Sequence, residues 1–416
     1  MRIKNRISII EWSLTILVVV ITACQLTSSS KNNKKNKTSL RYSINLEDAI
    51  KTKEKVAISE IANNIKYIPL ETTTKSLLGD INKVIISDTN IYIGGNQGLK
   101  KFSLGGEFIG KIGQTGRGPG EYMNLGNFGI TKKLNIIIIF DANSQKILWY
   151  NENGDFIKQV NKSLNGDHFV FFDNNKIALY SSKILVQPDS IVSSLIITDS
   201  YLNIIKTIPN IIQRTGKWSI ASVPLYIFND NLYYKDCFND TLYHLNSNNL
   251  RLEKYAVIKL GNYQLPAKIK LPLNQGISKL IEITKRAENK LTIRNIFESN
   301  KYLIFKLLYG FGIYKNDPLF VLFAKDRNIV KALSGNGFIN DLDGGLNFTP
   351  ASYININNQE YLIGWVNAFK LKEHVASAAF KSSTPKYPEK KKELEKLANS
   401  LKDDDNPVLM LVKLKE

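Results

Sequence analysis

The sequence predicts an all-β protein, a six-bladed β-propeller of four-stranded antiparallel blades with short helical insertions near the C-terminus. Two observations carry this prediction. A strand–turn–strand unit recurs every 46 to 48 residues, and its strands include continuous apolar runs such as Ile136–Phe140. Because neighbouring blades cover both faces of a middle strand, continuous apolar runs are typical of this fold.

Residues 1–23 are predicted to be a lipoprotein signal peptide. Arg2, Lys4 and Arg6 form a cationic start, and Trp12–Ala23 is an apolar run. This run is shorter than the about 20 residues that a membrane-spanning helix needs. It ends in Ile-Thr-Ala-Cys, which resembles the bacterial lipobox, so Cys24 is expected to carry the lipid. The alternative is an ordinary signal, or an anchor helix, that ends beside a cysteine.

Residues 24–40 are predicted to be a flexible tether, because they contain almost no apolar side chains. The whole chain has a net charge of +19 and a pI near 9.5. Such a chain is attracted to anionic surfaces, and export argues against nucleic acid as the partner. Cys237 is the only cysteine besides Cys24. A disulfide within a monomer, the expected oligomeric state, is therefore excluded after lipidation.

The repeat is clearest between Phe102–Ile112 and Tyr150–Val160, at an offset of 48 residues. In these copies Gly106 matches Gly154, and each glycine falls in the turn before the last strand. Weaker copies and two degenerate units follow at Leu195–Ile205, Asp240–Leu245, Tyr302–Lys331 and Ser352–Leu371. A β-sandwich is the alternative, but it would not require matching turns at constant spacing.

The two ends of residues 41–416 are predicted to close the ring of a single propeller domain. Lys66–Leu70 and Pro407–Lys415 both have strand character, and pairing them in one blade would leave no open edge. Two insertions are predicted to be helical, at 275–298 and at Pro388–Lys402. In the second insertion Leu394, Leu397 and Leu401 fall on one face.

Five stretches resemble the six-bladed, NHL-like β-propeller lipoproteins of Bacteroidetes. They are Tyr67–Thr72, Gly113–Tyr122, Asn239–Tyr243, Asn340–Gly345 and Asp404–Leu409. The resemblance implies a six-bladed fold and an exported protein that is lipid-anchored to the envelope, at the outer membrane. It implies no settled activity and no catalytic residue.

The chain departs from this family in two places. Gln25–Lys37 lacks the acidic residues that surface-displayed relatives usually carry after the lipidated cysteine, so the periplasmic and the surface-facing orientations both stay open. Leu346–Thr349 replaces a stretch where relatives tend to place Pro and Trp.

The glycine-rich stretch Gly113–Tyr122 could contact a ligand. Its glycines permit tight turns that bring backbone amides near an anion, and Arg117 could add a bidentate grip beside Glu121 and Tyr122. The alternative is a connection between blades in which Arg117 pairs with Glu121.

Carboxylates and tryptophans supply the remaining candidates. Asp141, Asp236 and Asp343 are the carboxylates that could converge in the channel, and Asp341 with Asp343 could hold Ca²⁺. A plain Asp/Gly turn is the alternative for that pair. Trp218 and Trp365 could form a platform for stacking sugars, or could belong to the core. The three histidines lack metal-site spacing, so we expect no zinc centre.

The leading functional hypothesis is a binding or scaffolding propeller, not an enzyme, whose partner is a glycan, a peptide or an envelope protein. The alternative is a metal-dependent hydrolase or lactonase-like enzyme with carboxylates in the channel. A third hypothesis is a structural partner in a nutrient-uptake assembly, which predicts a large exposed apolar patch. Aromatic rings and arginine in the channel favour binding, and three or more clustered carboxylates favour catalysis.

Overall fold

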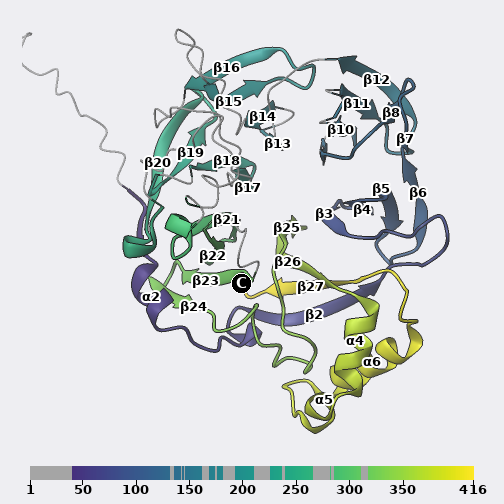
Figure 1. The fold of residues 1–416 in the computed structure, drawn as a ribbon, viewed down its shortest axis with the longest axis vertical. Coiled ribbons are helices and arrows are strands. Elements are labelled where there is room, and N and C mark those ends of the chain that lie inside the picture. The colour runs from purple at the N-terminus through teal and green to yellow at the C-terminus, as the bar shows by residue number, and fades with distance from the viewer. Residues whose placement is uncertain are drawn as a thin grey trace, which may run out of the picture. The chain divides into compact units, whose positions relative to one another are not determined.

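The computed structural model describes residues 40–131, 135–141, 143–144, 146–161, 168–173, 176–180, 193–209, 225–236, 239–265, 282, 285–310 and 317–416. Six antiparallel sheets of Leu40–Glu416 are arranged around a centre as the blades of a propeller (Figure 1). The predicted fold class is therefore confirmed. The predicted signal peptide and Cys24, as well as Trp218 and Cys237, lie outside the described residues.

Each blade has four antiparallel strands, and the first strand along the chain is the innermost in five of them. Blades 1 and 2 consist of β3 (Ile81–Ile86), β4 (Asn90–Gly95), β5 (Gly98–Ser103) and β6 (Phe108–Ile112), then β9 (Asn127–Ile130), β10 (Ile137–Asp141), β11 (Lys146–Tyr150) and β12 (Phe156–Asn161). Blade 3 consists of β13 (His168–Phe172), β14 (Lys176–Tyr180), β15 (Ser193–Thr198) and β16 (Ile204–Pro209).

The second half of the ring uses both ends of the domain. Blade 4 consists of β17 (Leu225–Phe228), β18 (Asn231–Lys235), β19 (Thr241–Asn246) and β20 (Arg251–Lys259), with β1 (Tyr42–Asn45) added parallel to β20. Blade 5 consists of β21 (Leu291–Glu298), β22 (Tyr302–Tyr309), β23 (Leu319–Ala324) and β24 (Ile329–Ala332). Blade 6 consists of β25 (Ser352–Ile356), β26 (Gln359–Val366), β27 (Val408–Leu414) and β2 (Ala62–Pro69).

The ring closes in blade 6 as the sequence predicts. Strand β2, from the start of the domain, pairs antiparallel with β27 from its end, and Tyr67 lies opposite Met410. Figure 1 shows these two strands side by side despite their distance in sequence. The C-terminal strand thus lies between the inner strands of its blade and an outer strand supplied by the N-terminal side.

The recurring turns have the same backbone geometry in successive blades. In blade 1 the Ser103 amide donates to the Glu107 carbonyl at 2.8 Å, and in blade 2 the Asn151 amide donates to the Asp155 carbonyl at 3.0 Å. Gly106 and Gly154 have φ values of +98° and +89°, and a Cβ at either position would meet backbone oxygen within 3.0 Å. The matched glycines therefore mark turns that need a residue without a side chain.

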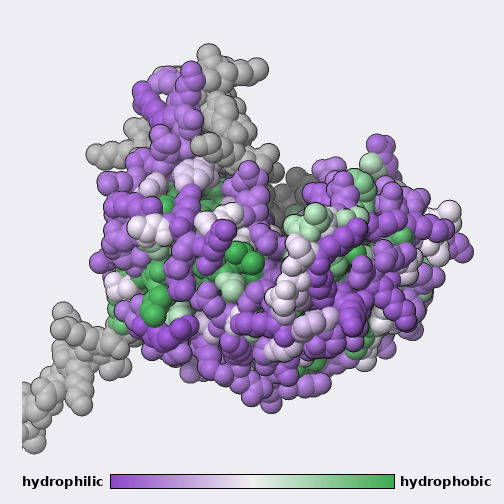
Figure 2. Space-filling model, turned by 90° about the horizontal axis from the view of Figure 1, so that it is seen from below, coloured by the Kyte–Doolittle hydropathy of each residue, from purple (hydrophilic) through white to green (hydrophobic). Residues whose placement is uncertain are grey.

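The apolar core is divided among the contacts between blades. Six clusters of buried side chains are found among the described residues, and each joins two neighbouring blades. Blades 1 and 2, for example, meet through buried side chains such as Tyr92, Phe128 and Leu148. The side of the domain seen in Figure 2 is mostly hydrophilic, with apolar residues in small groups.

The helices pack outside the blades. A segment of three helices follows β26: α4 (Ala368–Ala376), α5 (Ala378–Ser382) and α6 (Pro388–Ser400). The prediction of a helix at Pro388–Lys402 is confirmed, and Leu394, Leu397 and Leu401 all pack against the cluster between blades 5 and 6. No helix among the described residues is long and apolar enough to cross a bilayer.

The predicted helix at 275–298 is wrong over its last part, because Leu291–Glu298 forms β21, the inner strand of blade 5. Its side chains are covered on both faces, and tertiary packing therefore decides the conformation. The remaining short elements are β7 (Gln114–Thr115), β8 (Glu121–Tyr122), α2 (Glu47–Lys51) and single turns of 3₁₀ helix at Ile58–Glu60 and Gly261–Tyr263.

Candidate functional site

A cavity of about 670 Å³ lies where the inner strands of the six blades meet. Its lining includes residues of β3, β9, β13, β17, β21 and β25. A volume of this size lies within the range of small-molecule sites, which is about 300 to 1,000 Å³. The central cavity is therefore the candidate ligand-binding site.

Aromatic side chains from five blades line the cavity. They are Phe128, Phe169, Tyr226, Phe297, Tyr353 and Trp365. Of the two tryptophans predicted as a stacking platform, Trp365 of β26 does lie on this wall. Tyr353 of β25 in the same blade also lines it, but Trp365 packs toward blade 1 and Tyr353 toward blade 5. Flat apolar faces combined with a few polar groups are typical of sites that bind ring-shaped ligands.

Lys83 of β3 places an amine against this aromatic wall. Its Nζ donates to Asn127 Oδ1 at 2.9 Å and to the Phe128 carbonyl at 2.7 Å, and it lies 5.3 Å from the centre of the Phe128 ring. Burial lowers the pKa of Lys83 to about 8. The amine is thus held by neutral acceptors in surroundings that disfavour its charge.

Arg294 and Lys306 add two further cations from blade 5. The pairing of β21 with β22 shifts its register between Ile293 and Asn295, so Arg294 is the extra residue of a β-bulge, and Asn295 lies opposite Lys306. Both basic side chains line the cavity. Burial lowers the pKa of Lys306, and the positive charge of Arg294 lowers it further. A bulge re-aims a side chain and is common beside functional sites.

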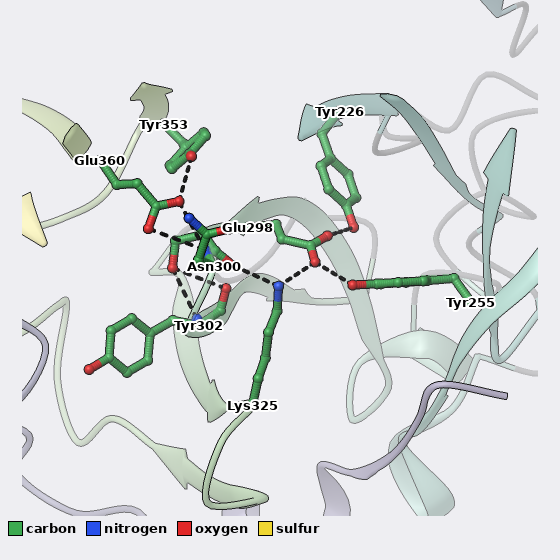
Figure 3. A network of polar contacts seen from close by, with 9 residues as sticks. Tyr226, Tyr255, Glu298, Asn300, Tyr302, Lys325, Tyr353 and Glu360 are labelled. Atoms are coloured by element: carbon green, nitrogen blue, oxygen red, sulfur yellow. Dashed lines mark hydrogen bonds and ion pairs between the residues drawn. The ribbon is translucent and has the colours of Figure 1, made fainter. Parts of the chain in front are cut away.

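The carboxylate at the end of β21 has very different surroundings (Figure 3). Glu298 accepts hydrogen bonds from the hydroxyls of Tyr226 and Tyr255, each at 2.6 Å, and forms an ion pair with Lys325 at 2.5 Å. The Glu298 side chain is fully buried, and that of Lys325 is 6% exposed. Burial raises the pKa of both tyrosines, and the Glu298 charge raises it further. Both tyrosines therefore stay protonated as donors.

The same network continues from blade 5 into blade 6. Lys325 also donates to the Ser299 carbonyl at 2.6 Å, and the Asn300 amide donates to Glu360 at 2.9 Å. Glu360 in turn accepts a bond from the Tyr353 hydroxyl at 2.7 Å. Figure 3 shows the two carboxylates on either side of the turn after β21. The network therefore joins three blades at the wall of the cavity.

The three predicted channel carboxylates lie elsewhere. Asp141 accepts bonds from the amides of Met123, Asn143 and Ser144, and Asp236 accepts one from the Tyr234 hydroxyl. Neither belongs to the cavity lining. Asp141 and Asp236 are both buried, and their hydrogen bonds stabilise the parts of the chain around them.

Asp343 lies in the loop before blade 6, also away from the cavity lining. It accepts bonds from Tyr67 (3.2 Å), Asn340 (2.7 Å) and the Gly345 amide (2.9 Å), and burial raises its pKa. The neighbouring Asp341 accepts bonds from Ser59 instead. The two carboxylates thus have separate partners, and no group of three or more potential metal ligands is found among the described residues.

The glycine-rich loop lies between blades 1 and 2. The hydroxyl of Tyr122 donates to the Ile112 carbonyl at 3.1 Å, and the hydroxyl of Tyr150 donates to the Gly120 carbonyl at 2.9 Å. Glu121 accepts bonds from Gln114 and the Gly118 amide. The Arg117 carbonyl accepts a bond from Lys146. The loop thus connects two blades through its own contacts, and its role as a ligand contact stays a prediction.

Sequence reasoning missed the basic residues of the cavity. Lys83, Arg294 and Lys306 belong to three strands and to no motif. A usable signal was present in two of them, because Lys306 interrupts the apolar run Tyr302–Tyr309 and Arg294 interrupts Leu291–Phe297. A charge inside a strand that is covered on both faces indicates a special environment.

Comparison with known proteins places the chain in a family. A family model described as "Domain of unknown function (DUF4934)" matches residues 41–413. No curated protein matches the sequence.

Two solved structures of Bacteroides proteins share the fold. One, from Bacteroides fragilis NCTC 9343, is described as a candidate exported protein; it is 17% identical, with 90% of this chain and 99% of that chain covered and a TM-score of 0.64. A member of the DUF4221 family from Bacteroides vulgatus ATCC 8482 is 12% identical, with 85% and 97% covered and a TM-score of 0.50.

Proposed function

The chain belongs to the DUF4934 family, and we propose that it is a lipid-anchored envelope protein whose propeller binds a glycan in its central cavity without transforming it. The observation that carries this proposal is the cavity itself. It has about 670 Å³ of space, walls of aromatic rings and a few polar groups from all six blades. Such a combination is typical of binding sites that hold a ring and fix its orientation.

Trp365 and Tyr353 are the side chains that we expect to contact the sugar rings. They lie on neighbouring strands of blade 6 and both line the cavity, Trp365 on the side of blade 1 and Tyr353 on the side of blade 5. The Tyr353 hydroxyl is bonded to Glu360, which fixes the position of its ring. A ring held in place before binding loses little conformational freedom on binding.

A second candidate function, a metal-dependent hydrolase, depends on Asp141, Asp236 and Asp343 converging in the channel. Each of them is instead hydrogen-bonded to other protein groups outside the cavity lining. The geometry of the described residues therefore favours binding over metal-assisted catalysis, and a Ca²⁺ site at Asp343 stays a weaker proposal.

The binding proposal is tested with the full chain in detergent against a panel of immobilised glycans. We expect at least one class of glycan to bind, and Trp365→Ala to weaken that binding at least tenfold, which is about 1.4 kcal/mol. Tyr201→Ala is the matched control, because Tyr201 is 69% exposed outside the cavity. Absence of binding to the whole panel, or equal effects of the two substitutions, would overturn the proposal.

The anchor is tested separately by mass spectrometry of protein extracted from native membranes. Lipidation predicts an N-terminal peptide that begins at acylated Cys24, and Cys24→Ala should leave residues 1–23 attached. Export is supported by the fold shared with a candidate exported protein of Bacteroides fragilis. A native protein that keeps Met1 and an unmodified Cys24 would contradict the anchor.

A further inference from the structure

Among the described residues, basic side chains outnumber acidic ones on the cavity wall. Lys83, Arg294 and Lys306 line it, against the carboxylate of Glu298. Glu298 already forms a buried ion pair with Lys325, which is outside the lining. The described part of the wall is therefore richer in basic than in acidic groups, and burial disfavours the charges of Lys83 and Lys306 in particular.

Burying these positive charges costs free energy when no ligand is bound. Taking a charge out of water is unfavourable unless an opposite charge replaces the lost solvation. Lys83 is held by an amide oxygen and a backbone carbonyl, which are neutral. Lys306 has the like charge of Arg294 near it. Natural proteins keep such unfavourable arrangements mainly where function needs them.

The order of the blades places the cations on both sides of blade 6. Blade 6 carries Tyr353 and Trp365, and it shares one core cluster with blade 5 and another with blade 1. Arg294 and Lys306 belong to blade 5 and Lys83 belongs to blade 1. A ring that stacks on blade 6 would therefore lie between cations on either side.

We propose that the ligand is an acidic glycan, and that Arg294, Lys306 and Lys83 bind the carboxylates of its uronic acid units. This inference rests on the proposed binding function and names the class of sugar. Arg294 suits this role because a guanidinium can bind both oxygens of a carboxylate at once. The β-bulge at Arg294 supports the assignment, because it gives this residue an orientation that a regular strand would not.

The experiment measures binding of three probes to the full chain in detergent by titration calorimetry. Digalacturonate is the acidic probe, galactobiose is its neutral counterpart, and galactose 1-phosphate tests whether a phosphate can replace the carboxylate. We expect digalacturonate to bind at least tenfold more tightly than galactobiose. Binding of digalacturonate should weaken in high salt, whereas binding of galactobiose should not.

Two substitutions separate the cavity from the general positive charge of the chain. Arg294→Gln and Lys306→Met should each reduce digalacturonate affinity at least fivefold and leave galactobiose affinity within twofold. Lys392→Met is the control, since Lys392 is exposed on α6 and lies outside the cavity lining. It removes the same charge and should change neither affinity.

Each outcome decides the inference. Equal binding of the acidic and neutral probes, or equal losses in Lys306→Met and Lys392→Met, would overturn the acidic ligand and leave the glycan-binding function standing. Binding of galactose 1-phosphate alone, or of none of the three probes, would also overturn it. The proposed function itself fails only if the glycan panel gives no binding that depends on Trp365.

Discussion

Strand β21 carries two charged side chains, Arg294 and Glu298, whose surroundings differ sharply. Glu298 is buried and surrounded by three donors, two tyrosine hydroxyls and the Lys325 ammonium. Arg294 lies at a bulge and has the like charge of Lys306 near it. Both residues line the same cavity.

The difference shows how a buried charge that serves folding can be told from one that serves binding. A carboxylate such as Glu298, whose hydrogen-bond donors all come from the protein, does not need a ligand to satisfy its charge. Replacing this carboxylate should therefore destabilise the fold. Burial disfavours the charges of Lys83 and Lys306 on the cavity wall, and a bound anion would relieve that cost. Stability measurements on variants of Glu298 and of Lys306, the neighbour of Arg294 on β22, should therefore give opposite signs.

The largest effect is expected from Glu298→Gln. This substitution leaves the buried ammonium of Lys325 without its counter-charge and weakens two tyrosine hydrogen bonds. The free energy of unfolding should fall by about 3 kcal/mol or more. Urea denaturation of the full chain, followed by tryptophan fluorescence, measures this change.

Glu373→Gln is the matched control for Glu298→Gln, because Glu373 is exposed on α4. It should change the free energy of unfolding by less than about 0.5 kcal/mol. If both variants unfold at the same urea concentration, the network in Figure 3 contributes little and the contrast with Arg294 disappears.

A smaller effect of opposite sign is expected from Lys306→Met. The methionine keeps much of the apolar length of the side chain but removes a partly buried charge beside Arg294. The free energy of unfolding should stay unchanged or rise by up to about 1 kcal/mol. A loss of more than 1 kcal/mol in the same urea experiment would mean that Lys306 has a structural role instead.

The sequence predicts the fold better than the site because the two depend on different distances along the chain. Gly106 and Gly154 mark turns that are formed by five consecutive residues, so their repetition is visible in the sequence. Ring closure is also predictable, because strand-like segments near both ends of the domain can complete one blade and leave no open edge.

The cavity depends instead on residues that only the closed ring brings together. Lys83 and Lys306 lie in different blades and are separated by more than half of the chain, so no local pattern relates them. Blade 5 is also one of the two units in which the repeat is degenerate, and the sequence predicts part of its first strand, β21, as a helix. The aspartates stand out in the sequence, but the structure uses Asp141 and Asp343 to hold loops and strands outside the cavity lining.

The smallest effect concerns the pH dependence contributed by Lys83. Its pKa is about 8 in the folded protein against 10.5 in its ordinary state. Between these values the unfolded chain binds a proton at this position that the folded protein has lost, so raising the pH favours the folded state. The stability of the wild type should therefore rise, relative to Lys83→Met, as the pH increases from 8 to 9.5.

The quantity to follow is the free energy of unfolding of the wild type minus that of Lys83→Met. This difference isolates Lys83, because Lys306 and several buried tyrosines with raised pKa values are present in both proteins. Arg294 and Glu298 on β21 and His168 on β13, the other ionisable groups of the wall, are also common to both. Urea denaturation at pH 7, 8, 9 and 9.5 gives this difference directly. A difference that does not change with pH would show that Lys83 keeps its proton in the folded state. Burial in the cavity would then disfavour the charge of Lys83 less than the residues around it indicate.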